Sequence, residues 1–327
     1  MLPAAELPSD GASPDHERSQ MILEQLGRVI VGQHAMLEQM LIALLAGGHA
    51  LLEGVPGTGK TLAILALSRV LGVTFGRIQF TPDLMPADVT GLSTFDPRER
   101  DFVFRPGPVF ADLLLADEVN RAPAKTQAAL LEAMQERRVT IDGVSRALPE
   151  HFTVFASQNP VESEGTYPLP EAQLDRFLMK IAVGYPDAQD ELELLARYTA
   201  GFDAGEPGTF ALSEILAAGE LGALRAAVRR VRMAEDVRAY VVALVRATRE
   251  DSALALGASP RAAVALFRAS QARAFTQGRD YALPEDVKEL ARPVLRHRVL
   301  VAPDAEIDGI TSDERIDAVL RTVEAPH

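Results

Sequence analysis

The residues that most clearly indicate chemistry form one short glycine-rich segment. Residues 54–61 read Gly-Val-Pro-Gly-Thr-Gly-Lys-Thr, which matches the pattern G-x-x-x-x-G-K-[S/T] at every fixed position. Glycines let backbone N–H groups converge on phosphate oxygens, and the helix that follows points its positive end at the same place. The pattern therefore predicts a site for ATP and Mg²⁺, with Lys60 on the β- and γ-phosphates and the Thr61 hydroxyl on the metal.

Two adjacent carboxylates follow an apolar run at residues 113–116. If this run is a strand of the same sheet, its carboxyl end lies at the cleft that holds the phosphates. We expect Asp117 to belong to the Mg²⁺ shell and Glu118 to polarise the attacking water. A carboxylate beside that water favours hydrolysis over transfer of the phosphoryl group to another acceptor.

Two further polar residues lie next to apolar runs. Asn159 follows residues 152–157, where it can orient water or contact phosphate, but Asn-Pro is also a turn dipeptide and the two interpretations have equal weight. Arg176 precedes residues 177–182; it can stabilise transition-state charge, although a single arginine at such a place is more often a surface ion pair.

Alternating strands and helices are expected to position these residues. Helical patterns at residues 61–71 and 125–137 separate several apolar segments, which favours a parallel sheet with helices on both faces. An Asp142-Gly143 pair flanked by apolar–polar alternation predicts a hairpin over 139–148, and residues 91–108 are expected to form an irregular insertion. The predicted strands are residues 49–53, 77–80, 113–117, 152–157 and 177–182.

The two ends of the chain differ from this central part. Residues 1–18 are expected to be a disordered tail, and helical patterns follow at 15–29 and 35–46. Beyond residue 185 the chain is rich in Ala, Leu and Arg, with helical apolar stripes and no strand pattern. We therefore expect an α/β domain over 19–185 and an all-α domain over 186–327. The arginines of the latter are expected on solvated helix faces, paired with Glu and Asp; they include Arg225, Arg229, Arg230 and Arg232.

Composition excludes several classes of function. The 327 residues suffice for two domains, and the absence of cysteine excludes disulfides, thiolate metal sites and cysteine nucleophiles. The six histidines make no pair at metal-ligand spacing. The longest apolar stretch, residues 40–46, is too short to cross a bilayer, and no signal peptide is recognisable, so a cytoplasmic protein without membrane insertion is expected. A net charge of −13 argues against non-specific nucleic-acid binding.

The chain resembles the MoxR branch of AAA+ ATPases over residues 20–320. The most specific stretches are LLEGVPGTGKT, LLLADEVNRAPAKTQAALLEAMQE and ASQNPVESEGTYPLPEAQLDRF. The resemblance implies an AAA+ core with a five-stranded parallel sheet followed by a helical lid. It also implies a homo-oligomeric ring, a hexamer, in which ATP lies between adjacent subunits.

Residue roles are carried over from the resemblance by position. Asn159 corresponds to sensor 1, Arg176 to an arginine finger that acts in trans, and Arg261 to sensor 2 on the lid, contacting the nucleotide of its own chain. The implied catalytic residues are Glu118, Asn159, Arg176 and Arg261, and the implied metal ligands are Thr61 and Asp117. The implied nucleotide contacts are Val31, Gly32, Gly54, Pro56, Gly57, Thr58, Gly59, Lys60, Thr61 and Leu62.

The function implied by the resemblance is that of a chaperone-like ATPase that matures protein partners carrying von Willebrand factor A domains. Residues 91–108 and 139–148 are the expected client contacts. A nucleic-acid motor is an alternative, but only 6% of the residues are aromatic and the hairpin at 139–148 has none for base stacking. A metal-chelatase motor subunit is another alternative, and a P-loop kinase is the weakest.

Overall fold

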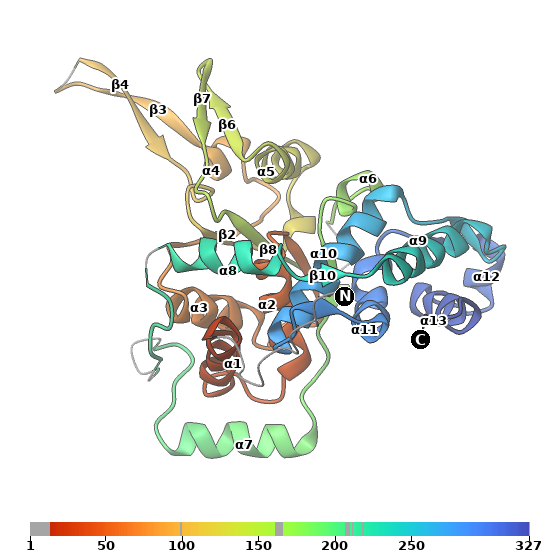
Figure 1. Cartoon of the computed structure of the whole chain (residues 1–327). Coiled ribbons are helices and arrows are strands. Elements are labelled where there is room, and N and C mark those ends of the chain that lie inside the picture. Colours follow the sequence, from red (N-terminus) through yellow and green to blue (C-terminus); the bar gives the residue numbers. More distant parts are fainter. Residues whose placement is uncertain are drawn as a thin grey trace, which may run out of the picture.

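The structure is a computed structural model that describes residues 14–98, 100–160, 166–206, 210, 212–217 and 219–326 (Figure 1). A five-stranded sheet has the order β2-β5-β8-β1-β9, and every neighbouring pair is parallel. This confirms the predicted core sheet. Its strands are β1 (Ala50–Glu53), β2 (Phe75–Gln79), β5 (Leu113–Asp117), β8 (Thr153–Gln158) and β9 (Met179–Ala182).

Helices cover both faces of the sheet because successive side chains of each buried strand point to opposite sides. In β5, Leu113 and Leu115 pack in one apolar cluster with the side chains of α1, α2 and α3. Leu114 and Ala116 pack in a second cluster with those of α5. The helices on the two faces are α1 (Pro14–Gly27), α2 (His34–Leu45), α3 (Lys60–Val70), α4 (Pro86–Thr90) and α5 (Ala124–Glu136).

The expected disordered tail is too long at its C-terminal end. Helix α1 spans Pro14–Gly27, which agrees with the helical pattern expected over 15–29 and contradicts the expected tail for residues 14–18. Arg18 donates to Glu220 at 2.9 Å, and the Ser19 hydroxyl bonds to the Asp15 carbonyl at 3.1 Å, which ties this first turn to the rest of the protein. The remainder of the predicted tail lies outside the described residues.

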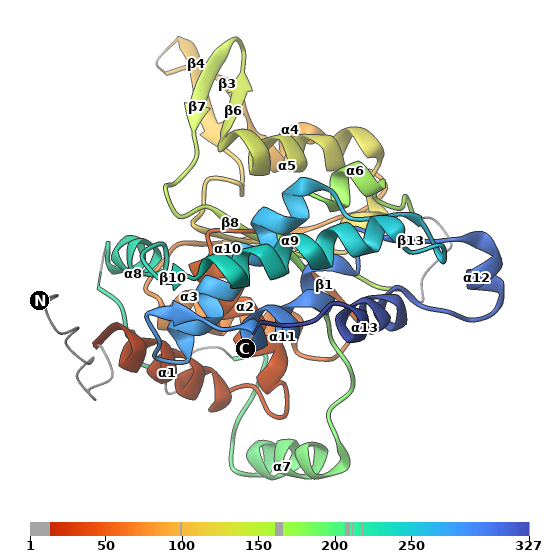
Figure 2. The same cartoon turned by 45° about the vertical axis from the view of Figure 1, so that its right-hand side comes forward.

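Two antiparallel ribbons project from the same side of the α/β part (Figures 1 and 2). The first pairs β3 (Gly91–Asp96) with β4 (Asp101–Pro106), so the expectation of an irregular insertion is wrong. The second pairs β6 (Arg138–Ile141) with β7 (Val144–Ala147), as predicted. Arg146 of the second ribbon lies over the Phe104 ring of the first, 3.9 Å from its centroid, so the two ribbons are in contact.

The C-terminal part is mainly helical, and the predicted apolar stripes are buried. It also contains two short ribbons that were not predicted: β10 (Arg232–Met233) with β12 (Tyr281–Ala282), and β11 (Leu254–Leu256) with β13 (Leu300–Val301). The remaining helices are a 3-10 turn at Val119–Arg121, α6 (Glu171–Leu174), α7 (Ala188–Thr199), α8 (Glu220–Val228), α9 (Glu235–Glu250), α10 (Pro260–Thr276), α11 (Pro284–Leu295), α12 (Pro303–Ile307) and α13 (Ser312–Thr322).

Helix α8 packs on the α/β part although it follows residue 185. Arg225 of α8 is buried and donates to the Leu44 carbonyl at 2.9 Å and to the Thr153 hydroxyl at 2.7 Å. The expectation of a solvated arginine is therefore wrong for Arg225, because two acceptors from distant segments meet its guanidinium. One apolar cluster joins α1–α3, α8 and α9–α11, and the division of the chain at residue 185 stays a prediction.

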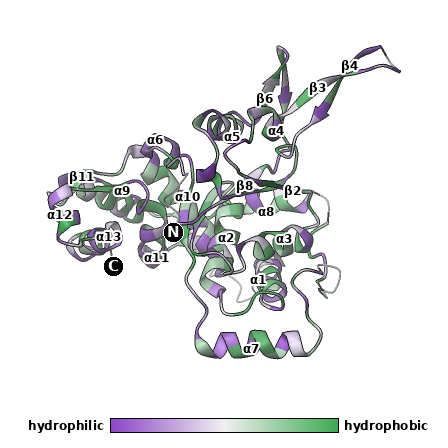
Figure 3. Cartoon of the chain, turned by 180° about the vertical axis from the view of Figure 1, so that it is seen from behind, coloured by the Kyte–Doolittle hydropathy of each residue, from purple (hydrophilic) through white to green (hydrophobic). Residues whose placement is uncertain are grey.

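Helix α7 stands apart from the other helices (Figures 1 and 2). None of its residues is buried, and hydrophobic and hydrophilic residues alternate along it (Figure 3). Within the described part of the chain, no helix is both long and apolar enough to cross a bilayer.

Candidate nucleotide site

The glycine-rich loop connects β1 to α3 at the carboxyl edge of the sheet. Gly57 and Gly59 have φ values of +83° and +82°, which a residue with a Cβ adopts only with strain. Gly54 is required for another reason: a Cβ there would lie 2.3 Å from the Val183 carbonyl oxygen, so only glycine lets β9 approach this closely. The local sequence thus fixes a loop whose backbone faces open space beside the helix start.

Lys60 lies over this loop. Its Nζ donates to the carbonyl oxygens of Gly54 at 2.6 Å and Val55 at 2.8 Å. Burial lowers the pKa of Lys60, and the nearby Asp117 and Glu118 carboxylates oppose that shift. The ammonium group therefore has negative charge on one side and the phosphate-binding loop on the other. Thr61 follows it in the first turn of α3.

Asp117 and Glu118 lie at the carboxyl end of β5, and Ser157 of β8 joins them. The Ser157 hydroxyl donates to Asp117 Oδ1 at 2.5 Å and accepts from the Glu118 backbone N–H at 2.9 Å. Arg77 donates to Asp117 Oδ2 at 2.9 Å. Sequence reasoning did not identify Ser157; its signal was a hydroxyl near the carboxyl end of β8, two residues before Asn159.

Glu118 has a left-handed backbone, with φ of 55° and ψ of 48°. Its Oε2 accepts from Gln79 Nε2 at 2.8 Å and from Arg121 Nη1 at 3.0 Å. These two donors hold the carboxylate at the carboxyl edge of the sheet. Neither donor was identified from the sequence. The strained backbone fits a functional position, because it turns the side chain away from the strand and toward the cleft.

A cleft of about 430 Å³ brings most of the predicted residues together. Lys60, Thr61, Asp117, Glu118 and Asn159 line its polar end, and Asn159 is nine-tenths buried. The other predicted residues that line it are Val31, Gly54, Pro56, Gly57, Thr58, Gly59 and Leu62. Gly32 lies beside the cleft, where a Cβ would meet the Asp190 carboxylate at 2.1 Å.

The other end of the cleft is apolar. Val29, Ile30 and Val31 line one wall, and α7 with the residues after it supplies Leu194, Tyr198 and Phe202. Sequence reasoning missed this second wall. Its signal was the spacing of four residues between Leu194 and Tyr198, which places these two side chains on one face of α7; Phe202 follows the end of the helix.

Arg176 and Arg261 lie elsewhere. Both line a second pocket, together with Asp175, Arg268 and other residues, and neither lines the cleft that contains Lys60. Arg261 Nη1 is 3.6 Å from Asp175 Oδ2. Arg261 thus lies outside the cleft in this structure, and its expected contact with the nucleotide of its own chain stays a prediction. The role of Arg176 in trans stays a prediction.

Comparison with known proteins identifies relatives of both parts of the chain. A family model described as the ATPase family associated with various cellular activities (AAA) matches residues 49–179, and one described as the AAA lid domain matches residues 246–319. Chaperone MoxR1 of Mycobacterium tuberculosis is 45% identical over 99% of this chain and 87% of its own length. The uncharacterized protein YeaC of Bacillus subtilis is 44% identical over 93% of each chain.

A solved structure supports the same relationship. A protein of Cytophaga hutchinsonii, described provisionally as an ATPase, superposes with a TM-score of 0.88. It is 41% identical, and the match covers 96% of each chain.

Proposed function

The chain belongs to the MoxR family of AAA ATPases, and we propose that it hydrolyses ATP to remodel protein clients as a chaperone-like ring. The observation that carries this proposal is the separation of two half-sites. Lys60, Asp117 and Glu118 lie in one cleft, whereas Arg176 and Arg261 lie in another pocket. A site that needs both sets is complete only when a second copy supplies the arginines.

The residues of the cleft fit ATP and Mg²⁺. The Thr61 hydroxyl and the Asp117 carboxylate are hard oxygen donors of the kind that Mg²⁺ prefers, and they would hold the metal. The bound ion would neutralise charge on the β- and γ-phosphates. Lys60 and the backbone of residues 54–59 bind the phosphates, and the apolar end, with Ile30 and Tyr198, takes the adenine.

Glu118 orients the attacking water. Gln79 and Arg121 hold its carboxylate through two hydrogen bonds, and Ser157 fixes its backbone N–H. Such restraint positions the carboxylate before the reaction, so little reorganisation is required in the transition state. Asn159, nine-tenths buried at the same edge, orients the γ-phosphate or the water.

The arginine pocket serves the neighbouring subunit of a ring, which we propose is a hexamer. Arg176 and Arg261 of one subunit would contact the γ-phosphate bound by the next. Arginine fingers of this kind contribute about 10³- to 10⁵-fold to the rate in other nucleoside triphosphatases. Because each site is shared, hydrolysis at one subunit changes the contacts that hold its neighbour, and this couples ATP to motion of the ring.

The two projecting ribbons are the proposed client contacts. Phe95 and Phe102 of the first ribbon are 54% and 69% exposed and form an edge-to-face pair with ring centroids 5.6 Å apart. Exposed aromatic residues on a projecting element are typical of protein-binding surfaces. We propose partners with von Willebrand factor A domains, on the strength of the family resemblance.

One experiment tests this function. Glu118→Gln is expected to bind ATP but hydrolyse it at least 100-fold more slowly, so that rings and clients stay together during purification. Lys60→Ala, which weakens ATP binding, is the matched control that should retain no client. Capture of a protein with a von Willebrand factor A domain supports the proposal. Capture of nucleic acid alone would contradict the proposal and support a nucleic-acid motor. Capture of chelatase subunits alone would contradict the proposal and support a metal-chelatase motor subunit.

A further inference from the structure

Arg298 is a buried arginine that holds the segment containing Arg176. It lies just after α11, is 7% exposed, and donates Nε to Asp175 Oδ1 at 2.8 Å. Its other nitrogens donate to backbone carbonyls on the far side of Arg176: to Phe177 O at 2.6 Å and to Leu178 O at 2.9 Å. A longer bond of 3.3 Å reaches the Asp175 carbonyl. The guanidinium thus contacts the backbone both before and after Arg176.

Asp175 connects this buried arginine to Arg261. Its Oδ1 accepts from Arg298, and its Oδ2 lies 3.6 Å from Arg261 Nη1 and 3.5 Å from the Ser259 hydroxyl. One carboxylate therefore faces a buried cation on one side and the first turn of α10 on the other. Since α10 begins at Pro260, this contact also fixes where that helix starts relative to the Arg176 segment.

The Arg176 side chain itself is not held by these contacts. Within the described part of the chain, no hydrogen bond or ion pair engages its guanidinium, which lines the pocket with Arg261. The backbone of the segment is fixed while the charged group stays available to an acceptor from outside the chain. A free guanidinium on a fixed backbone is the arrangement that an arginine finger requires.

We propose that Asp175 and Arg298 are positioning residues that hold Arg176 and Arg261 as one two-arginine unit for the nucleotide of the adjacent subunit. The inference rests on the proposed function, in which that site is shared. Arg298 acts through its planar fork: its nitrogens donate in separate directions to the Asp175 carboxylate and to backbone carbonyls that include those of Phe177 and Leu178, and a lysine ammonium cannot reach all of these acceptors.

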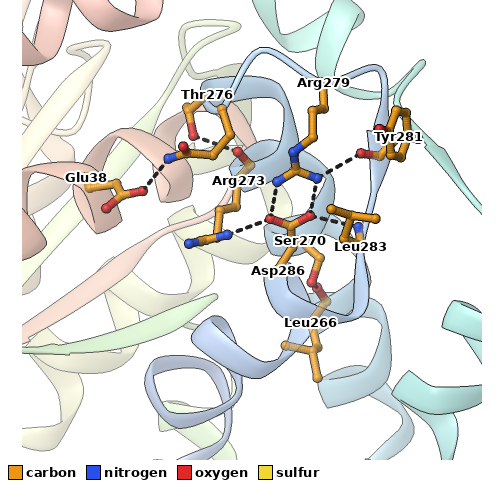
Figure 4. Close-up of polar contacts among 10 residues, drawn as sticks. Glu38, Leu266, Ser270, Arg273, Thr276, Arg279, Tyr281, Leu283 and Asp286 are labelled. Carbon is orange, nitrogen blue, oxygen red and sulfur yellow. Dashed lines mark hydrogen bonds and ion pairs between the residues drawn. The ribbon is translucent and has the colours of Figure 1, made fainter. Parts of the chain in front are cut away.

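A second buried carboxylate–arginine cluster, with a purely structural role, provides a matched control. In the helical part, Asp286 is buried and accepts from Arg273 at 2.6 Å and from Arg279 at 2.6 and 2.7 Å (Figure 4). These ion pairs join the end of α10 to the start of α11. Asp286 and Arg279 line neither the cleft nor the arginine pocket. Arg279→Lys is therefore expected to lower thermal stability without a selective effect on ATP turnover.

The test compares Arg298→Lys and Asp175→Asn with Arg279→Lys. Each variant is assayed alone and mixed with an excess of Glu118→Gln subunits, which hydrolyse ATP at least 100-fold more slowly but carry intact arginines. Wild-type subunits mixed in the same way set the reference rate. Arg298→Lys alone should lose at least 10-fold in kcat with KM for ATP changed less than two-fold, and the mixture should restore most of the reference rate. Asp175→Asn should give the same results. If Arg298→Lys does not fold, Asp175→Asn alone decides the test.

Arg176→Ala in the same mixture separates the two ways in which the inference can fail. If Arg176→Ala recovers and neither Arg298→Lys nor Asp175→Asn does, the site is shared but the two residues do not position the arginines. If Arg176→Ala itself does not recover, the arginines do not act in trans, and the shared site and this inference fall together. If Arg279→Lys loses as much kcat as Arg298→Lys, the effect of Arg298 is one of general stability, and the proposed positioning role is contradicted.

Discussion

Ser157 donates its hydroxyl proton to the Asp117 carboxylate over 2.5 Å. The same oxygen accepts the backbone N–H of Glu118, so one side chain fixes both carboxylates of the site. Ser157→Ala should leave that N–H without its partner and Asp117 free to turn. We expect kcat to fall about 10-fold and the Mg²⁺ concentration for half-maximal activity to rise. A Mg²⁺ titration of ATPase activity measures both.

Ser270→Ala is the control for this substitution. Ser270 is also fully buried, but its hydroxyl bonds only to the Leu266 carbonyl one turn earlier in α10. An unchanged Mg²⁺ requirement in Ser157→Ala, or an equal change in Ser270→Ala, would argue against a role of Ser157 in metal binding.

Arg225 should contribute to stability although it carries a charge. Arg225→Met keeps much of the aliphatic volume but leaves the Leu44 carbonyl and the Thr153 hydroxyl without their donor. We expect a loss of about 1–3 kcal/mol in the free energy of unfolding, measured by urea denaturation. The exposed Arg230, on the segment after α8, supplies the control Arg230→Met, which should change the free energy of unfolding by less than about 0.5 kcal/mol.

His49 should make the protein less stable in acid. Its Nδ1 accepts from the Val154 N–H at 2.9 Å, and its Nε2 lies 3.2 Å from the Met134 carbonyl, so both contacts are satisfied by the neutral ring. Burial lowers its pKa from 6.5 to about 4. Between these values the unfolded chain binds a proton that the folded chain does not, so stability is complete above pH 6.5 and falls toward pH 4.

The contribution of His49 can be measured from the pH dependence of unfolding. The free energy of unfolding should drop by about 2–3 kcal/mol between pH 7.5 and 4.5 on account of this group. In His49→Gln the drop should shrink by that amount, even if stability at pH 7.5 is lower. The exposed His34 gives the control His34→Gln, in which the drop should persist. An identical pH dependence in all three proteins would contradict the assignment.

Phe102 should matter to clients and not to hydrolysis. Phe102→Ser removes the most exposed aromatic ring of the first ribbon, and Phe102 does not line the cleft. We expect basal ATPase activity to stay within two-fold, while client affinity falls about 30-fold, as for a residue worth about 2 kcal/mol at an interface. Leu300→Ser, at a 46% exposed position of β13, is the control that should leave client binding intact.

The sequence predicted those features that depend on local pattern. The loop at residues 54–61 has a fixed spacing, and β5 opens with a continuous apolar run because both of its faces are covered. Asp117 and Glu118 could be placed because they directly follow such a run. The first ribbon was missed because β3 and β4 are exposed on both faces and therefore lack an apolar alternation.

Features that depend on packing between distant segments were not predictable. The burial of Arg225 requires acceptors from α2 and β8, which its neighbours in the sequence do not reveal. The position of Arg261 depends on how α10 packs against α2, α9 and α11, so its place in the pocket with Arg176 could not be read from the sequence. Likewise, no local pattern marks Arg298 as the partner of the Arg176 segment, since more than a hundred residues separate them.

The first ribbon has a consequence for how such proteins diversify. None of the described residues from 92 to 108 is buried, so their side chains contribute less to the stability of the fold than those of the buried core strands. Substitutions there can accumulate, or the whole ribbon can be exchanged between paralogues, while the ATP cleft is retained unchanged. The same independence makes the ribbon a natural place for grafting when the ATPase is to be redirected to a new client.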